Sequence, residues 1–284
     1  MKRILTALAC AFAFAMACNA QMTAARMMAY GGAERAPEGF VITFTSGTTP
    51  SSISLHSSYA GPKTAALALY DSGDGVWTSY TSRTIPVKGN YVAFKGDWRN
   101  SAGTYAYMFK STLADAAYTC RFSGAFTVYP THQEAYREMF RDCSRVTDIA
   151  DNPIPNLSGA PASYMFSYAC SGMSSVTALP ANFMNTSGLT GAPASSMFNN
   201  ACNGMTSVTN AYVFQLSPNI TFTPENVVSL NALTAAFINM PKFTGSVMWG
   251  DQNLFTAFTP TEDVNTINGS PLIQGYTEAG ANWK

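Results

Sequence analysis

The side chains of this chain that could perform chemistry are few and far apart. There are two histidines, His56 and His132, which are too few and too widely spaced for a recognisable zinc motif. A serine or threonine nucleophile needs a base beside it, yet residues 152–224 contain no charged residue and no histidine. No nucleophile elbow, zinc-protease motif or phosphate loop is present. The sequence therefore predicts a protein that is not an enzyme and has no catalytic residue, cofactor or metal site.

The acidic residues that could form an acid/base pair are scattered singly. A glycan hydrolase needs two carboxyl groups within about 10 Å of each other, and the candidates are Asp97, Asp115, Glu134 and Asp142. Solvated surface charge explains these residues more simply. A secreted glycan hydrolase is therefore kept only as an alternative.

The first twenty residues have the pattern of an export signal. Lys2 and Arg3 precede an apolar run over residues 4–17, and Ala20 supplies the small residue that a signal peptidase needs. A lipoprotein signal that acylates Cys18 is the alternative, although no leucine stands three residues before it. We expect an exported protein that is secreted or held at the cell surface.

The composition of the rest of the chain excludes two classes of protein. No later segment approaches the roughly 18 consecutive apolar residues of a membrane span. Charged residues make up 11% of the chain, against about 25% in ordinary soluble domains, and they form no basic stripe of the kind that nucleic-acid binding requires. Neither a membrane span nor a nucleic-acid partner is expected.

The charge-free stretch contains an internal repeat. Residues 159–177 and 191–209 are identical at 14 of 19 positions at an offset of 32, and a fixed period of this length is typical of a solenoid. The repeat predicts buried positions that stack between neighbouring copies: Met165, Phe166, Cys170, Met197, Phe198 and Cys202.

The segments on either side of this repeat predict other elements. Residues 40–45, 91–94, 105–109 and 118–129 read as short strands of a small sandwich or barrel, and residues 131–142 read as an amphipathic capping helix. The predicted fold is α+β, with a β-sandwich-like domain before a short leucine-rich-repeat-like α/β solenoid. The expected segments are a signal peptide (1–20), a linker (21–37), a β-rich domain (38–130), the solenoid with its capping helix (131–255) and a C-terminal tail (256–284).

Three phrases in the chain resemble those of a known family. They are MFRDCSRVT (139–147), MFSYACSGMSSVT (165–177) and MFNNACNGMTSVT (197–209). They are similar to the repeats of the BspA-like leucine-rich-repeat family of bacterial surface proteins, and residues 76–98 resemble the modules that precede such repeats. Leucine is scarce, however, and the 32-residue spacing exceeds the 20 to 29 of ordinary leucine-rich repeats. Whether each period holds one coil or two is left open.

Four cysteines follow the export signal: Cys120, Cys143, Cys170 and Cys202. An exported chain with an even number of cysteines suggests disulfides. Three of the four, however, are assigned to equivalent positions on the helical side of the repeat, where coils would stand about 8 to 10 Å apart. This exceeds the 7 Å limit between bridged Cα atoms, so buried free thiols are favoured over disulfides.

The expected function is binding. The resemblance implies adhesion to a host or microbial surface protein or glycan, through a hydroxyl-rich repeat face that displays Ser175, Thr177, Thr190 and Thr209. The alternative is a structural spacer, with the ligand contact made by the β-rich domain through Trp77, Tyr80 or Trp98. The sequence identifies neither the ligand nor the oligomeric state.

Overall fold

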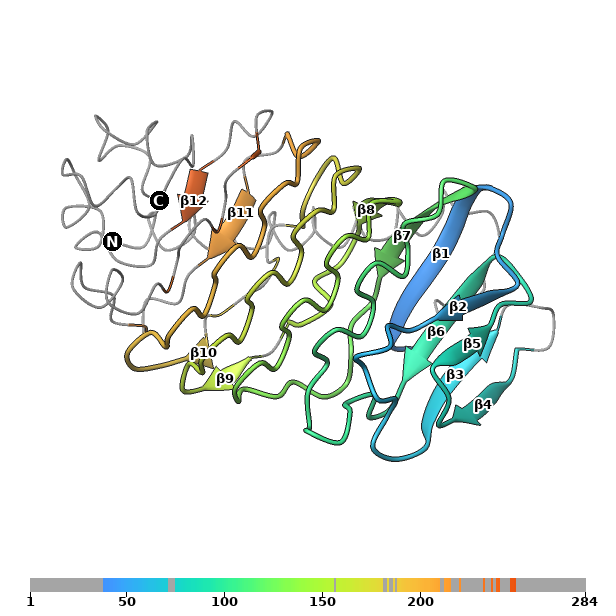
Figure 1. The fold of residues 1–284 in the computed structure, drawn as a ribbon, viewed down its shortest axis with the longest axis horizontal. Coiled ribbons are helices and arrows are strands. Elements are labelled where there is room, and N and C mark those ends of the chain that lie inside the picture. Colours follow the sequence, from blue (N-terminus) through green and yellow to red (C-terminus); the bar gives the residue numbers. More distant parts are fainter. Residues whose placement is uncertain are drawn as a thin grey trace, which may run out of the picture. The chain divides into compact units, whose positions relative to one another are not determined.

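The computed structural model describes residues that lie between Glu38 and Met248. The described residues are 38–70, 75–155, 157–180, 183, 186, 188–209, 212–215, 220, 232, 236, 239–240 and 246–248. The predicted signal peptide, linker and C-terminal tail lie outside them. The described part forms twelve strands and no helix (Figure 1).

The largest element is a mixed six-stranded sheet. Its strands are β1 (Phe40–Gly47), β3 (Ala66–Tyr70), β4 (Trp77–Tyr80), β6 (Tyr91–Lys95), β7 (Tyr118–Ser123) and β8 (Val146–Ile149). Their order is β4-β3-β6-β1-β7-β8, and only the β7–β8 pair is parallel. Alternate residues of β7 are buried, because successive side chains of a strand point to opposite faces.

Three smaller sheets complete the described strands. β2 (Ser52–Ser54) pairs antiparallel with β5 (Thr84–Pro86), β9 (Ser158–Gly159) pairs parallel with β10 (Gly188–Leu189), and β11 (Tyr212–Gln215) pairs parallel with β12 (Ser246–Met248).

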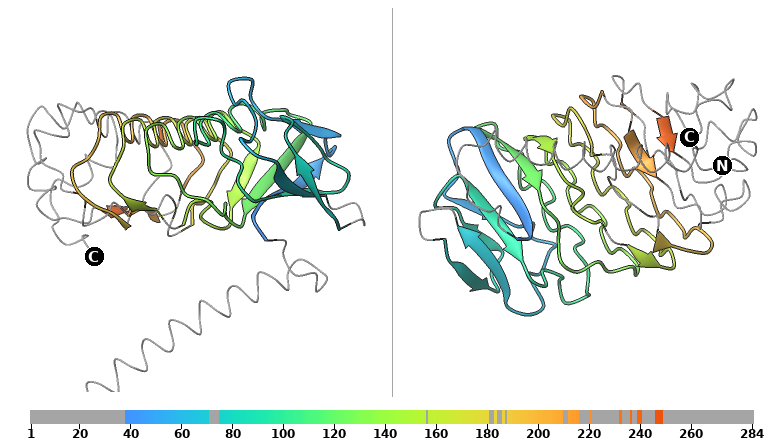
Figure 2. Two further views of the ribbon diagram at one scale, coloured as in Figure 1. Left: turned by 90° about the horizontal axis from the view of Figure 1, so that it is seen from below. Right: turned by 180° about the vertical axis from the view of Figure 1, so that it is seen from behind.

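The repeat region is built from stacked turns. Four segments that consist mainly of consecutive turns, residues 103–113, 132–143, 162–173 and 194–205, are called rows 1 to 4. They lie side by side along one face (Figure 2). Alternate N–H groups of a row donate to carbonyls of the next row at 2.7 to 3.0 Å, as from Glu138 to Ser167. The intervening N–H groups donate three residues back within their own row, as from Arg137 to Glu134. The backbone polar groups of these rows are thereby paired without strand or helix.

A left-handed residue recurs every fourth position in these rows. Row 2 has positive φ at Glu134, Glu138 and Asp142, and row 3 has it at Tyr164, Tyr168 and Gly172. Such a conformation costs a residue other than glycine roughly 1–2 kcal/mol. At Gly172 a Cβ would also stand 2.4 Å from the Asp142 carboxylate. The inter-row hydrogen bonds and the buried side chains must therefore outweigh a strain that returns in every row.

The predicted α+β fold with an α/β solenoid is wrong. No described residue is helical, and the strands form small mixed sheets. The Met-Phe phrases and the predicted capping helix at 131–142 are rows of turns, because a left-handed residue at every fourth position interrupts the helical bonding pattern. The Val-Thr pairs that end the two longer phrases, at 176–177 and 208–209, would be the strands of such a solenoid, but neither pair is a strand. Of the predicted strands, 40–45 and 91–94 are confirmed, 118–129 is strand only to residue 123, and 105–109 belongs to row 1.

One hydrophobic core runs through the sheet and the rows. It extends from Phe40 to Met240 among the described residues, so it crosses the domain boundary predicted after residue 130. One column of rings is stacked through all four rows. The centroid distances are 5.9 Å from Tyr105 to Tyr136, 5.2 Å from Tyr136 to Phe166 and 5.2 Å from Phe166 to Phe198. The six predicted repeat positions, Met165, Phe166, Cys170, Met197, Phe198 and Cys202, are all buried.

The rows also correct the alignment of the three phrases. Tyr136, and not Phe140, stacks on Phe166, and the Phe140 N–H donates to Ala169, next to Cys170. Cys170 and Cys202 therefore share a column with Phe140, while Cys143 stands three residues further along, at the position of Met173 and Met205. The sequence comparison placed Cys143 in the same column because the Met-Phe dipeptide recurs four residues later in row 2 than in the other rows.

Candidate binding surface

The outward side of the turn rows carries a group of charged and aromatic side chains, which we call the turn-face cluster. Its members come from rows 1 to 3: Tyr107, Lys110, Arg137, Glu138, Arg141, Tyr164 and Tyr168. The inter-row hydrogen bonds set the register that brings them together, although they are up to 61 positions apart in the sequence.

One line of the cluster is a guanidinium between two tyrosines. The Arg137 Cζ lies 5.8 Å from the ring centroid of Tyr107 and 5.3 Å from that of Tyr164. Within about 6 Å of a ring a cation is attracted by the π-electrons. Tyr164 is 37% exposed, and only it and Val76 are exposed among the large hydrophobic side chains of the described residues. This line therefore offers an ordered aromatic ring to a partner.

A second line is centred on a buried carboxylate. Glu138 is 5% exposed, and its Oε2 lies 2.5 Å from the Lys110 Nζ and 3.0 Å from the Arg141 Nη1. Burial alone would raise the pKa of the Glu138 carboxyl, but its hydrogen bonds and charge interactions with Lys110 and Arg141 outweigh burial and lower that pKa. The Arg141 Cζ in turn lies 4.8 Å from the Tyr168 ring centroid. The carboxylate thus holds one cation of row 1 and one of row 2, and Arg141 extends the line to Tyr168 of row 3.

Row 4 occupies the same surface without charge. The Asn200 side-chain amide donates to Asn199 at 2.6 Å, Asn203 donates to Asn200 at 2.7 Å, and Asn239 donates to Asn203 at 2.9 Å. The turn face therefore changes along its length from a charged and aromatic surface to one of amides.

The sequence-predicted binding residues are only partly brought together. Thr177 and Thr209 are exposed neighbours, and the N–H of Thr209 donates to the Thr177 carbonyl at 3.1 Å. Ser175 is half-buried close to them in the chain. Thr190 is exposed but follows β10, where its N–H donates to Gly159 at 2.8 Å. The hydroxyl face is thus reduced to Ser175, Thr177 and Thr209.

The four cysteines are buried and unbridged. This outcome agrees with the favoured expectation, but the distance argument behind it was wrong. The N–H of Cys170 donates to Ala201 at 2.8 Å, so the rows are closer than packed helices. Burial raises the pKa of the Cys120 and Cys202 thiols to about 12, and raises that of Cys143 and Cys170 as well. Thiols held protonated in this way are poor nucleophiles.

The candidate acid/base groups are engaged in structural contacts. Asp97 accepts two hydrogen bonds from the Arg99 guanidinium, at 2.8 and 2.6 Å, and these bonds lower the pKa of its carboxyl. The Nε2 of His132 lies 2.9 Å from the Gly103 carbonyl oxygen. The pKa of His56 is lowered by burial and by the charge of Lys110. Among the described residues, no group of three or more His, Cys, Asp or Glu side chains could hold a metal ion.

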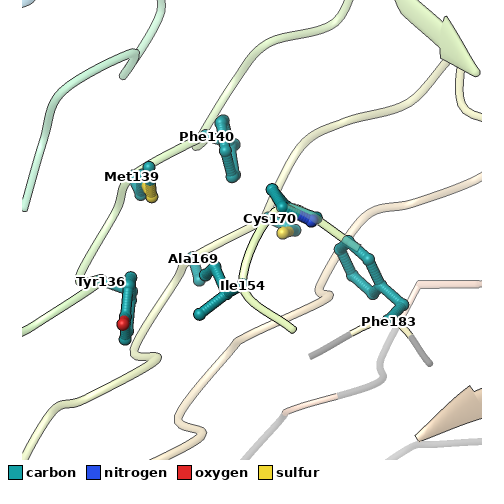
Figure 3. Close-up of a pocket in the computed structure, with 8 residues that line it drawn as sticks. Tyr136, Met139, Phe140, Ile154, Ala169, Cys170 and Phe183 are labelled. Carbon is teal, nitrogen blue, oxygen red and sulfur yellow. The ribbon is translucent and has the colours of Figure 1, made fainter. Parts of the chain in front are cut away.

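A narrow apolar gap lies behind rows 2 and 3 (Figure 3). Its lining residues are Tyr136, Met139, Phe140, Pro153, Ile154, Ala169, Cys170 and Phe183. It exposes no polar surface and has no room for a water molecule. The ring of Tyr136 lines the gap, and its hydroxyl is buried without a hydrogen-bond partner. The gap is a packing defect rather than a ligand site.

Sequence reasoning found part of the turn-face cluster and missed the rest. It placed Glu134, Arg137, Glu138 and Arg141 on the polar side of the expected helix, and all four side chains form ion pairs. It missed Tyr107, Tyr164 and Tyr168. The signal that could have found Tyr164 and Tyr168 is their four-residue spacing, which matches that of Glu134, Glu138 and Asp142 in row 2.

The chain matches no protein-family model, no curated protein and no solved structure. No membrane-crossing helix is found in the part of the chain that the structure describes.

Proposed function

We propose that this chain is an exported, non-catalytic protein that binds a partner protein through the turn-face cluster. The observation that carries the proposal is the contrast between the rows. Row 4 keeps the same backbone bonding and the same buried columns with only amide and hydroxyl groups outside. The charges and tyrosines of rows 1 to 3 are therefore not required by the fold, which favours a role in recognition.

The chemistry of the cluster fits a protein partner. Tyrosine and arginine are enriched at the centres of protein interfaces. Arg137 and Arg141 are already held on tyrosine rings, at 5.3 Å from Tyr164 and 4.8 Å from Tyr168, so they lose little side-chain entropy when a partner covers them. We expect Tyr164, which is 37% exposed, to be the anchor.

The balance of charge in the cluster predicts how binding responds to salt. Lys110, Arg137 and Arg141 are offset by ion pairs with Glu134, Glu138 and Asp142. A surface with no net charge attracts a partner mainly at short range, and short-range contacts are little affected by screening. Binding should therefore depend weakly on ionic strength.

The absence of catalysis and the exported location are parts of the same proposal. Buried thiols with raised pKa values and an Asp97 carboxyl with a lowered pKa are unsuited to nucleophilic or general-acid roles. The proposal of export rests on the pattern of the first twenty residues. The proposal of surface adhesion rests on the resemblance of three phrases to BspA-like repeats, although the solenoid fold that this resemblance implied is not found.

A binding screen tests the proposal with the chain as it would be after export, residues 21–284. Arrays of cell-surface proteins and of glycans are probed with the wild type, with Arg137→Ala/Tyr164→Ala and with the matched row 4 control Asn199→Ala/Asn203→Ala. Loss of an anchor pair is expected to weaken protein binding by roughly 30-fold or more, which corresponds to about 2 kcal/mol. The control should bind like the wild type.

Three outcomes would contradict the proposal. One is binding only to glycans. Another is protein binding that the row 1 to 3 variant leaves intact. The third is loss of binding in Thr177→Lys/Thr209→Lys alone, which would return the site to the hydroxyl face. Truncation is unsuitable here, because the sheet and the rows share one core.

A further inference from the structure

The six-stranded sheet has one protected end and one open end. At the β8 end the chain continues into the rows, and the N–H of Thr177 donates to the carbonyl of Thr147, a residue of β8, at 3.3 Å. At the other end β4 pairs only with β3, and no described strand lies against its outer side. Figure 1 shows β4 at this border. An unpaired strand edge presents a row of backbone donors and acceptors to any strand that can pair with it.

The β4 edge lacks the features that usually prevent pairing. Residues 75–82 contain no charge and no proline, whereas edge strands are commonly guarded by lysine, proline or a bulge. Val76, just before the strand, is 53% exposed, and Thr78 and Ser79 are exposed within it. Aromatic and β-branched residues, which favour strands, make up most of the segment. The edge is therefore ready for strand addition.

We propose that β4 pairs antiparallel with β4 of a second copy of this chain, so that two six-stranded sheets join into one. The two sheets form one continuous sheet only if directly opposed residues of the two β4 strands point to the same face. Trp77 packs on the small outer cluster of Val41 and Ala93, while Tyr80 packs on the main core. This parity requires the twofold axis to pass through a residue, and the register centred on Thr78, with Thr78 opposite Thr78 of the second copy, pairs the uncharged residues 76–80 completely. Trp77 then lies opposite Ser79, and Val76 opposite Tyr80.

A second copy fits this edge better than an unrelated strand. Antiparallel pairing of a strand with itself is the arrangement that a twofold axis generates, and it continues the antiparallel order of β4, β3, β6, β1 and β7. In this register the β-branched Val76 lies across from the aromatic Tyr80 of the second copy, which is a favourable cross-strand pair. With no charge over residues 75–82, the edge neither repels its own copy nor selects a partner of opposite charge.

Pairing would affect binding without sharing the binding site. In the strand order, β4 stands at the opposite end of the sheet from β8, where the chain continues into the rows. Two joined copies would present two turn-face clusters, and linked sites bind a multivalent surface more tightly than one site does.

Sedimentation of residues 21–284 over a wide range of protein concentration tests the proposal. The wild type is expected to shift reversibly from monomer to dimer. Thr78→Lys places two lysines directly opposite each other on the axis, and like charges so placed are destabilising, so this variant is expected to stay monomeric. Thr209→Lys adds the same charge to an exposed threonine outside the sheet and should dimerise like the wild type.

A crosslink checks the register. Thr78→Cys should give a dimer joined by a disulfide when oxidised with diamide, since paired Cα atoms on the axis fall within bridging distance, whereas Thr209→Cys should not. A wild type that stays monomeric at its solubility limit overturns the proposal, and so does a Thr78→Lys variant that still dimerises. If Thr78→Lys unfolds by circular dichroism, the crosslink decides alone. Neither result depends on the turn-face partner.

Discussion

Rows 1 to 3 and row 4 share a backbone and differ in what they display. In all four, alternate N–H groups reach the next row and a left-handed residue recurs at every fourth position. Rows 1 to 3 carry the ion pairs and tyrosines of the turn-face cluster, whereas row 4 carries asparagines. The comparison indicates that the buried side chains determine the backbone conformation of a row, whereas the outward-facing side chains can vary.

The largest effect should come from breaking the interior that the rows share. Phe166→Ala removes the ring that is stacked between Tyr136 and Phe198, and loss of a buried phenylalanine side chain costs about 3–5 kcal/mol. Thermal unfolding followed by circular dichroism should show a clearly lower midpoint. Tyr164→Ala, in the same row but exposed, is the control. Equal losses in both variants would show that the column does not specify the rows.

A smaller loss of stability is expected when the buried charge of the turn-face cluster is removed. Glu138→Gln leaves Lys110 and Arg141 without their shared carboxylate, and hydrogen bonds to charged groups contribute about 1.5–3 kcal/mol. Chemical denaturation at neutral pH should show this loss. Asn203→Ala, which removes an amide of row 4 at the position that Arg141 holds in row 2, should cost less.

The wild type and Glu138→Gln can also be compared as a function of pH. The folded chain lowers the pKa of Glu138, so its contribution is complete above the ordinary glutamate value of about 4.3 and is lost as pH falls through the lowered value. The stability difference between the wild type and Glu138→Gln should therefore be constant near neutrality and shrink in acid. A difference that grows in acid would mean that Glu138 is not held as a carboxylate.

A gain of stability is expected at one ring of the shared column. The Tyr136 hydroxyl is buried without a partner, and the equivalent residues of rows 3 and 4 are phenylalanines. Tyr136→Phe should stabilise the chain by about 1 kcal/mol, because an unsatisfied buried polar group is removed. Tyr105→Phe is the matched control, and it should destabilise, since the Tyr105 hydroxyl donates to Val128 at 3.0 Å.

The smallest effect concerns the left-handed positions. Ser196 has a φ of 53°, at the position that Gly103 holds in row 1. Ser196→Gly should be neutral or stabilising by up to about 1 kcal/mol, because glycine adopts positive φ without steric cost. Ser195→Gly, one residue earlier and not left-handed, should destabilise slightly. If both variants lose stability equally, the conformation at residue 196 is not strained.

Sequence reasoning succeeded where a pattern of residues is compatible with one structure alone. The identity of residues 159–177 with 191–209 pointed to the burial of Phe166 and Phe198, and the alternation over residues 40–45 predicted β1. It failed where two structures produce the same spacing. Apolar residues at Ala135, Met139 and Phe140 suit an amphipathic helix, and they suit equally a row of turns whose pattern repeats every four residues.

The turn-face cluster shows a second limit of sequence reasoning. Arg137, Glu138 and Arg141 are close together in the chain, and their polarity was visible. The contacts of Arg137 with Tyr107 and Tyr164 depend on a row register that is set by backbone hydrogen bonds. That register in turn needs positive φ at Tyr164, Glu138 and similar residues. Because these residue types rarely adopt positive φ, their identities did not indicate the conformation.

The uniform sense of the inter-row hydrogen bonds gives the stack an electrical polarity. In a β-sheet the peptide dipoles of a strand largely cancel, but here every described bond between rows runs from an N–H of the earlier row to a carbonyl of the later one. The dipoles add, as they do along a helix, and row 1 lies at the negative end. Lys110, the one charged residue of row 1, lies at that end, where a positive charge is most favoured.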